Sequence, residues 1–261
     1  MMFRGFALLL ALWSVIVLVG CATTKANPDP WEPMNRGTFA FNEFADEWVV
    51  SPVARAWRFV LPNVVETGID NFFENARSPV DVLNNVLQGE LEEGYFQSWR
   101  FVLNSTFGIA GFIDVASLAG WPDHPEDFGL TLGTWGVAQG PYLVLPVLGA
   151  SSVRDTVGMG VDATAAAYTY FVPFYVPIAA RAVDLLNQRA IFFDEIAQSR
   201  EEAFDFYVFV RNAYLQNRER RLSGGPAGGK RDAPIRTSQE DDDLYYFDED
   251  AEDEDTADDA D

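Results

Sequence analysis

Apolar residues follow a helical period through the part of the chain that begins near residue 50. Residues 53–60 place four apolar side chains at i, i+3, i+4 and i+7, the spacing of one helix face. Ser51 and Pro52 stand just before this run and Pro62 just after it. A helix is therefore predicted to begin at Ser51-Pro52 and to end before Pro62.

Similar patterns predict further helices along the chain. Apolar residues in 65–73 suggest a second helix, and Ser78-Pro79 is predicted to open a third that stops at Gly89. Within 91–104, one stripe holds Leu91, Tyr95, Trp99 and Val102, and polar side chains such as Gln97 and Arg100 lie away from it. Residues 182–222 predict two long amphipathic helices or one kinked helix. No sustained period-two alternation appears, so the predicted fold class is all-α.

The middle of the chain is unusually apolar. Residues 128–153 carry no charge, and Arg154, Asp155 and Asp162 are the only charged residues between 128 and 180. Seven Gly and Pro residues interrupt the first run, and irregular backbone facing lipid would leave amides unsatisfied. Half a hydrocarbon core is about 15 Å, which roughly ten helical residues cover. Two short pieces at 163–170 and 171–180 fit that length, so the domain is predicted to sit in one leaflet. An unusually apolar soluble core is the alternative.

The N-terminus has the pattern of an export signal. Arg4 precedes fourteen uncharged residues and the small residue Gly20, which predicts a signal peptide at 1–20. The sequence LVGC at 18–21 resembles a bacterial lipobox, so Cys21 is the predicted lipidation site, carrying a diacylglycerol and an N-acyl chain and no other cofactor. The alternative is an ordinary signal peptide before a free cysteine. Because Ala22 and Thr23 follow instead of aspartate, the sorting rule of such lipoproteins favours the outer membrane.

Charge divides the rest of the chain into two parts. The net charge is −22, and residues 237–261 contribute fourteen acidic and no basic side chains. Such a surface argues against nucleic-acid binding, which needs Lys and Arg to neutralise phosphates. One domain is predicted at 21–222, followed by a flexible linker and a disordered acidic tail at 223–261. The apolar segment 244–247 within the tail could also be a docking motif.

Several segments carry a family resemblance, in order along the chain. They are 29–36 (DPWEPMNR), 71–75 (NFFEN), 84–89 (NNVLQG), 100–114 (RFVLNSTFGIAGFID), 126–133 (EDFGLTLG), 140–146 (GPYLVLP) and 152–155 (SVRD). Together with the lipobox, they resemble the MlaA (VacJ) family of phospholipid-binding lipoproteins. The resemblance extends from Cys21 to Tyr214.

The resemblance implies a ring-like helical domain in the inner leaflet of the outer membrane, often beside a trimeric porin. Such proteins are not enzymes. They take phospholipids that have strayed into the outer leaflet and pass them to a soluble periplasmic lipid carrier, which maintains lipid asymmetry. The uncharged segment 136–153 could form the wall of a lipid passage, so Tyr142, Leu143 and Leu145 are candidate passage residues.

Four further candidates for the lipid passage come from the same motifs. Arg154 and Asp155 could meet a lipid headgroup or could pair within the protein. Phe41 and Asn42 could serve the passage, or could supply helix packing and an amide hydrogen bond. A purely structural lipoprotein that tethers a porin remains an alternative function for the whole chain.

Enzyme chemistry has little support in the sequence. There is no G-x-S-x-G motif, and the one histidine, His124, stands in the turn-like segment 121–126. Neither a catalytic site nor a metal site is predicted, since one histidine and one lipidated cysteine do not make a zinc site and no EF-hand pattern occurs.

Replacing Cys21 tests the anchor. Cys21→Ala removes the thiol to which the acyl chains attach, so labelled palmitate should not enter the protein. Palmitate labelling of wild type and variant, followed by immunoprecipitation, measures this. Labelling that persists in the variant would contradict the predicted lipidation site.

Overall fold

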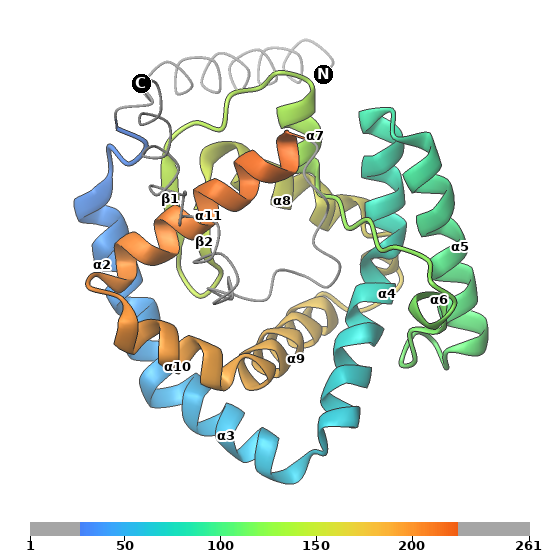
Figure 1. The fold of residues 1–261 in the computed structure, drawn as a ribbon, viewed down its shortest axis with the longest axis horizontal. Helices are drawn as coiled ribbons and strands as arrows, with labels where there is room; N and C mark the ends of the chain where they lie inside the picture. The colour runs from blue at the N-terminus through green and yellow to red at the C-terminus, as the bar shows by residue number, and fades with distance from the viewer. Residues whose placement is uncertain (1–26, 224–261) are drawn as a thin grey trace, which may run out of the picture.

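The computed structural model describes residues 27–223, which form a ring of helices and one small hairpin (Figure 1). The signal peptide, Cys21 and the acidic tail lie outside the described residues. The elements are α2 (Glu32–Ala45), a π-helical segment η1 (Asp46–Val50), α3 (Ser51–Val60), α4 (Asn63–Gln88), α5 (Leu91–Phe107), α6 (Val115–Leu118), α7 (Phe128–Thr134), β1 (Tyr142–Leu145), β2 (Gly149–Ser152), α8 (Val153–Ala165), a 3₁₀ segment η2 (Ala167–Tyr170), α9 (Tyr175–Ile191), α10 (Phe193–Glu202) and α11 (Phe206–Leu222).

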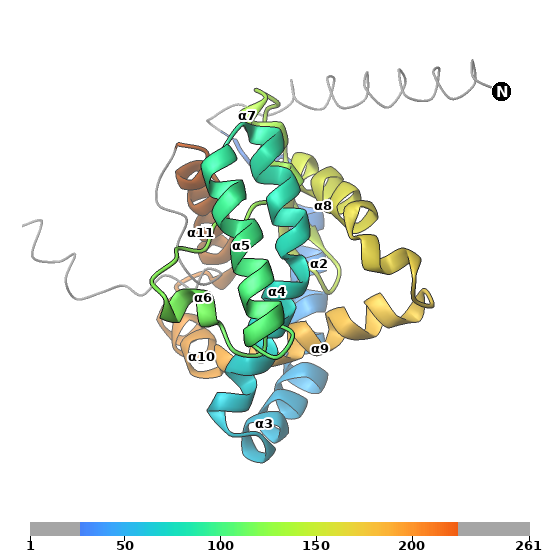
Figure 2. The ribbon, with the colours of Figure 1, turned by 90° about the vertical axis from the view of Figure 1, so that its right-hand side faces the viewer.

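Contacts between elements close the ring. Helix α4 packs on α7, α7 on α8 and α11, and α11 on β2. Strand β1 packs on α2, which continues through η1 into α3, and α3 packs on α9, which returns to α4. Helix α5 lies along the outer side of α4 (Figures 1 and 2). The chain therefore encloses a centre instead of covering a compact core.

One predicted helix start and two predicted stops are confirmed, and one predicted start is wrong. Helix α3 begins at Ser51 with Pro52 in its first turn and ends at Val60, before Pro62, although the π-helical segment η1 precedes it without a break. Pro79 lies inside α4, which extends unbroken over 26 residues. Gly89 ends α4 with a left-handed φ of 86°, a conformation that glycine adopts without steric cost.

The C-terminal half contains more breaks than the periodicity predicts. Residues 182–222 fall into parts of three helices, α9, α10 and α11, and the expected pieces at 163–170 and 171–180 are instead the end of α8, η2 and the start of α9. Residues 142–145 and 149–152 form an antiparallel hairpin that the all-α prediction missed. Each strand has four residues, which is too short for period-two alternation to show.

The ring is polar inside and apolar outside. On α5, Tyr95 is 59% exposed, whereas Gln97 and Arg100 are 2% and 5% exposed. The apolar stripe predicted from the sequence therefore faces outward. Large exposed apolar side chains occur all along the chain, including Phe59 (91%) and Phe174 (81%). None of the helices in residues 27–223 combines the length and apolar character of a membrane span.

Buried amide side chains hold the joints between helices. Asn187 of α9, fully buried, accepts a hydrogen bond from the indole of Trp57 in α3 and donates one to a backbone carbonyl of α4. Asn84 of α4, also fully buried, donates to Asp162 of α8 and accepts from Thr131 of α7, each at 2.9 Å. A buried polar group that lost such a partner would cost about 1–3 kcal/mol.

Helices α7 and α8 meet at a glycine contact. A Cβ at Gly158 of α8 would lie 2.3 Å from the backbone nitrogen of Gly129 in α7, while a Cβ at Gly160 would meet no atom within 4 Å. The two backbones thus approach as closely as they do only because Gly158 lacks a side chain.

This contact predicts opposite effects of one substitution at two positions in α8. Gly158→Ala should destabilise the protein by about 1–3 kcal/mol because backbone must move to admit the methyl group. Gly160→Ala should be neutral or stabilising by up to about 1 kcal/mol through helix propensity. Thermal unfolding in mild detergent measures both. Equal stability of the two variants would contradict the close α7–α8 contact.

Candidate functional site

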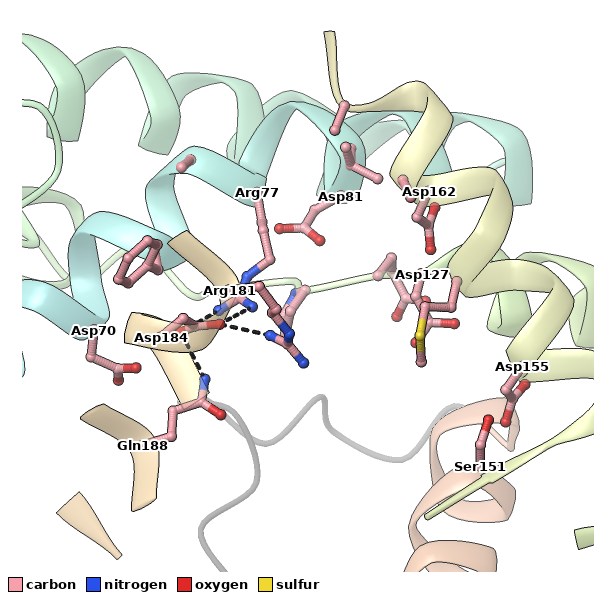
Figure 3. Close-up of a pocket in the computed structure, with 18 of the residues that line it drawn as sticks. Asp70, Arg77, Asp81, Asp127, Ser151, Asp155, Asp162, Arg181, Asp184 and Gln188 are labelled. Carbon is pink, nitrogen blue, oxygen red and sulfur yellow. Dashed lines mark hydrogen bonds and ion pairs between the residues drawn. The ribbon is translucent and has the colours of Figure 1, made fainter. Parts of the chain in front are cut away.

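The centre of the ring holds a cavity of about 780 Å³. Its walls come from α4, α8, α9, α11, strand β2 and the loop before α7. Four arginines and seven acidic residues line it, together with small and apolar side chains such as Ala163, Ala180 and Phe192. Figure 3 shows charged side chains from α4, α8 and α9 directed into this space. The cavity is therefore amphipathic, and its charges lie where a soluble domain would bury hydrocarbon.

One wall carries two arginines on a single carboxylate. Asp184 of α9, whose side chain is 3% exposed, accepts hydrogen bonds from Arg77 of α4 (2.9 Å) and Arg181 of α9 (2.6 Å). Gln188 Nε2 donates to Asp184 Oδ1 at 3.2 Å. Arg77, Arg181 and Asp184 together carry a net charge of +1. The side chain of Arg181 remains 44% exposed. A positive, partly accessible guanidinium thus stands at the cavity wall.

The opposite wall is an ion-pair network of two arginines, Arg154 and Arg218, and two aspartates, so its net charge is zero. Arg218 of α11 pairs with both oxygens of Asp127, at 2.6 and 2.8 Å, and its Nε lies 2.9 Å from Asp155 Oδ2. Asp155 also accepts a hydrogen bond from the Tyr214 hydroxyl. Burial alone would raise the pKa of Asp127, but the paired guanidinium of Arg218 outweighs it and lowers that pKa to about 2. This network fixes α11 against α7 and α8.

Two carboxyl groups at the cavity have no such counter-charge. Burial raises the pKa of Asp81 well above its ordinary value, and the neighbouring carboxyl of Asp123 adds to the rise. Burial also raises the pKa of Asp162, against hydrogen bonds from the Phe128 N–H and Asn84. Neither Asp81 nor Asp162 forms an ion pair with any basic side chain in residues 27–223. Within those residues, no group of three or more His, Cys, Asp or Glu side chains is placed to hold a metal ion.

The candidates Asn42 and Leu145 lie together at the hairpin. Asn42 Nδ2 donates to the Leu145 carbonyl at 2.9 Å, and Asn42 Oδ1 accepts from the Val147 N–H at 2.8 Å. Val147 has a φ of 66°, which strains a β-branched residue. Asn42 therefore holds the turn of the hairpin against α2.

Asn35 of α2 holds the start of the same hairpin. Its Nδ2 donates to the Tyr142 carbonyl at 2.9 Å, and its Oδ1 accepts from the Val144 N–H at 3.0 Å. Tyr142 is fully buried in a small cluster with Val144 and Tyr207, and burial raises the pKa of its hydroxyl. Two amides on one face of α2 thus fix β1 along its length.

Among the candidate passage residues, Asp155 lines the central cavity and the others do not. Arg154 is 4% exposed and pairs with Asp155 at 3.0 Å. Leu143 is half-buried on β1, as is Leu145, and Phe41 is exposed on the outside of α2. The structure brings Asn42 to the hairpin and Arg154 to Asp155 but does not gather the whole set. Their part in lipid passage stays a prediction.

Sequence reasoning missed most of the charged cavity wall, including Arg77, Asp81, Arg181, Asp184 and Arg218. A signal was present in α4, where the buried polar residues at 75, 78, 81, 84 and 85 recur with a helical period. A search for polar stripes in an otherwise apolar chain could have found that face.

Comparison with known proteins places the chain in a family. The family model described as "MlaA lipoprotein" matches residues 27–221. The chain belongs to the MlaA lipoprotein family. The intermembrane phospholipid transport system lipoprotein MlaA of Shigella flexneri is 35% identical over 217 residues, which cover 80% of this chain and 86% of that protein. The protein of the same name in Haemophilus influenzae is 33% identical and covers 84% and 91%.

A solved structure shares the fold. It is described as the structural basis for maintenance of bacterial outer membrane lipid asymmetry. It is 34% identical, has a TM-score of 0.67, and covers 74% of this chain and 98% of that chain. As an MlaA family member, the chain is a membrane-associated lipoprotein with a mostly helical fold, which confirms the resemblance drawn from the sequence motifs.

A partly buried carboxyl group on α4, that of Glu74, predicts that the stability of the protein depends on pH. Burial, with a contribution from Asp70, raises the pKa of Glu74 from 4.5 to about 8, and Glu74 Oε1 has no hydrogen-bond partner in the described structure. The folded state therefore favours the protonated carboxyl. Its stabilising effect is complete below about pH 4.5 and is lost as the pH rises to about 8.

Glu74→Gln removes this titration. Relative to wild type, the variant should gain up to about 4 kcal/mol between pH 4.5 and pH 8, since one pKa unit is about 1.4 kcal/mol. Urea unfolding at several pH values measures the difference. Glu92→Gln, which replaces an exposed glutamate on α5, should follow the wild-type curve. A constant difference between Glu74→Gln and wild type across the range would refute the raised pKa.

Proposed function

We propose that this chain is an outer-membrane lipoprotein that removes mislocalised phospholipids from the outer leaflet and passes them through its central cavity towards the periplasm. The observation that carries the proposal is the closed ring with a charged cavity of about 780 Å³ inside and apolar side chains outside. A charged headgroup crosses hydrocarbon only at high cost. A passage that is polar within and apolar around its rim lowers that cost.

The outer surface fits immersion in one leaflet. Aromatic and aliphatic side chains on α3, α5 and α9 are exposed, among them Phe59, Leu91 and Ile178. Exposed apolar patches of this extent mark membrane or protein contact. Because the charge of the chain is strongly negative, attachment to anionic lipid must be hydrophobic. Acyl chains on Cys21 would add the second anchoring signal that stable attachment needs.

The partners in this proposal follow from the family. The relatives from Shigella flexneri and Haemophilus influenzae are named as lipoproteins of an intermembrane phospholipid transport system. We infer that the chain sits beside a trimeric porin in the outer membrane and delivers lipid to a soluble periplasmic carrier. The carrier would make transport directional by removing lipid that has entered the cavity, so the chain itself needs no nucleotide.

The chain is proposed to act without catalysis. Ser151, a hydroxyl at the cavity wall, lies 2.9 Å from the Thr156 hydroxyl and donates to the Ser152 carbonyl. No general base contacts it among the described residues, as nucleophilic hydrolysis would require. The backbone of His124 is bound to Gln97 and Asn85 in the loop before α7. These contacts give both groups structural roles.

Filling the cavity separates a lipid passage from a porin tether. Ala180 of α9 lines the cavity, whereas its neighbour Ala179 is exposed and does not. Ala180→Trp should block the passage, so outer-leaflet phospholipid should stay as high as in the deletion strain. Ala179→Trp adds the same side chain outside and should restore lipid asymmetry. Labelling of outer-leaflet phospholipid in complemented cells measures both.

A tether would give a different result. If Ala180→Trp is present at the wild-type level and restores asymmetry as well as Ala179→Trp does, the cavity is not a passage. Release of lysophospholipid by the purified wild-type protein would instead support an enzyme.

A further inference from the structure

The cavity wall has a charge pattern that the transport proposal does not explain by itself. On the α4–α9 side, Arg77 and Arg181 share Asp184 and carry a net charge of +1. Arg181 donates one hydrogen bond, through Nη1 to Asp184. It has no other acceptor in residues 27–223, and its side chain is 44% exposed. A guanidinium with free donors at a cavity is suited to bind the oxygens of a phosphate.

A buried carboxyl stands one helical turn away. Asp81 follows Arg77 at i+4 on α4, so their Cβ atoms are about 5–6 Å apart. Asp81 lines the cavity and is 7% exposed. The charge of Arg77 acts on it, but the two do not form an ion pair, because Arg77 is bound to Asp184. Figure 3 shows Arg77 and Arg181 both bound to Asp184, with Asp81 directed into the same cavity.

The two neighbouring sites, one positive and one carboxyl, match the two charges of one kind of lipid. A phosphate diester carries one negative charge, and in an ethanolamine lipid the primary ammonium follows it by two carbons. With the phosphate on Arg181 and Arg77, an ammonium directed towards Asp81 in the same cavity would supply the ion-pair partner that Asp81 lacks. A glycerol headgroup offers hydroxyls in that place and leaves Asp81 without a counter-charge.

We propose that the cavity is a binding site for zwitterionic glycerophospholipid headgroups, in which Arg77 and Arg181 bind the phosphate and Asp81 binds a primary ammonium. This inference rests on the proposed lipid passage and adds a headgroup preference to it. The cavity volume of about 780 Å³ lies within the range of roughly 300–1,000 Å³ for small-molecule sites. It admits a headgroup and glycerol, while most of the acyl chains extend beyond it.

Competition between two lipids tests the assignment. The full-length protein in mild detergent is incubated with equimolar phosphatidylethanolamine and phosphatidylglycerol of identical chains, repurified, and analysed for bound lipid by mass spectrometry. Wild type should retain several-fold more phosphatidylethanolamine. Bound lipid in the ratio of the mixture would overturn the headgroup inference and leave the passage intact. No bound lipid at all, together with no transport in cells, would overturn the proposed function.

Variants separate the two halves of the site. Asp81→Asn should keep total bound lipid and bring the ratio to within about twofold of the mixture. Arg181→Gln should lower both lipids about tenfold. Arg58→Gln is the matched control, because Arg58 pairs with Asp194 on an exposed surface away from the cavity. If the folded Asp81→Asn protein keeps the wild-type ratio of phosphatidylethanolamine to phosphatidylglycerol, Asp81 does not bind the ammonium. If that variant does not fold, the ratio bound by the wild-type protein decides the proposal.

A soluble compound separates a lipid from a free phosphodiester. Glycerophosphoethanolamine carries the same headgroup without chains and should bind at least a hundredfold more weakly than the lipid. Equal binding in calorimetry would make this a site for soluble phosphodiesters and overturn the assignment to lipid.

Discussion

Hydrogen bonds from buried amide side chains hold this ring together. Asn35 fixes β1 to α2, Asn84 joins α4 to α7 and α8, and Asn187 joins α9 to α3 and α4. The buried apolar residues in the described part of the chain are few, and a small cluster of them centres on Tyr142 and Tyr207. A protein whose outer face meets lipid gains little from hydrophobic burial there. Its joints must therefore be polar and directional.

The charged cavity follows from the same constraint. Helices that turn their apolar faces outward direct their polar faces inward, so Arg77, Asp184 and Arg218 all line the central cavity. Each buried carboxylate that is ionised there needs its own donors, and Asp184 has hydrogen bonds from Arg77, Arg181 and Gln188. Carboxyls without a cationic partner, such as Asp81, keep a raised pKa. The ring fold and the charged cavity therefore have one cause, an inverted polarity in which apolar side chains face outward and polar side chains face the centre.

Periodicity in the sequence locates helical segments but does not say which face of each helix is buried. Leu91, Tyr95 and Trp99 form the predicted stripe, yet they are exposed while Gln97 and Arg100 are buried. An apolar stripe has the same period whether it faces the protein interior or faces outward. Only the medium around the protein, water or lipid, decides between the two orientations. Ser78-Pro79 has the pattern of a helix start, yet α4 contains Pro79 in its interior. The hairpin and the cavity wall depend on contacts between distant segments, such as Asn42 with Leu145, which local patterns do not encode. The ring-like arrangement of the helices was predicted from the resemblance of the motifs to a known family, and periodicity alone does not predict it.

The most direct test of this inverted polarity is to measure whether side chains around the ring face lipid or water when the protein is reconstituted in bilayers. Nitroxide labels at Phe59, Leu91 and Phe174, on three sides of the ring, and at Ala163 in the cavity can be compared in bilayers by their accessibility to oxygen and to a water-soluble nickel complex. The inverted polarity predicts that the first three labels meet oxygen and exclude nickel, while the cavity label is reached by nickel. Nickel access at all three outer positions would show that water surrounds the ring and would contradict the account.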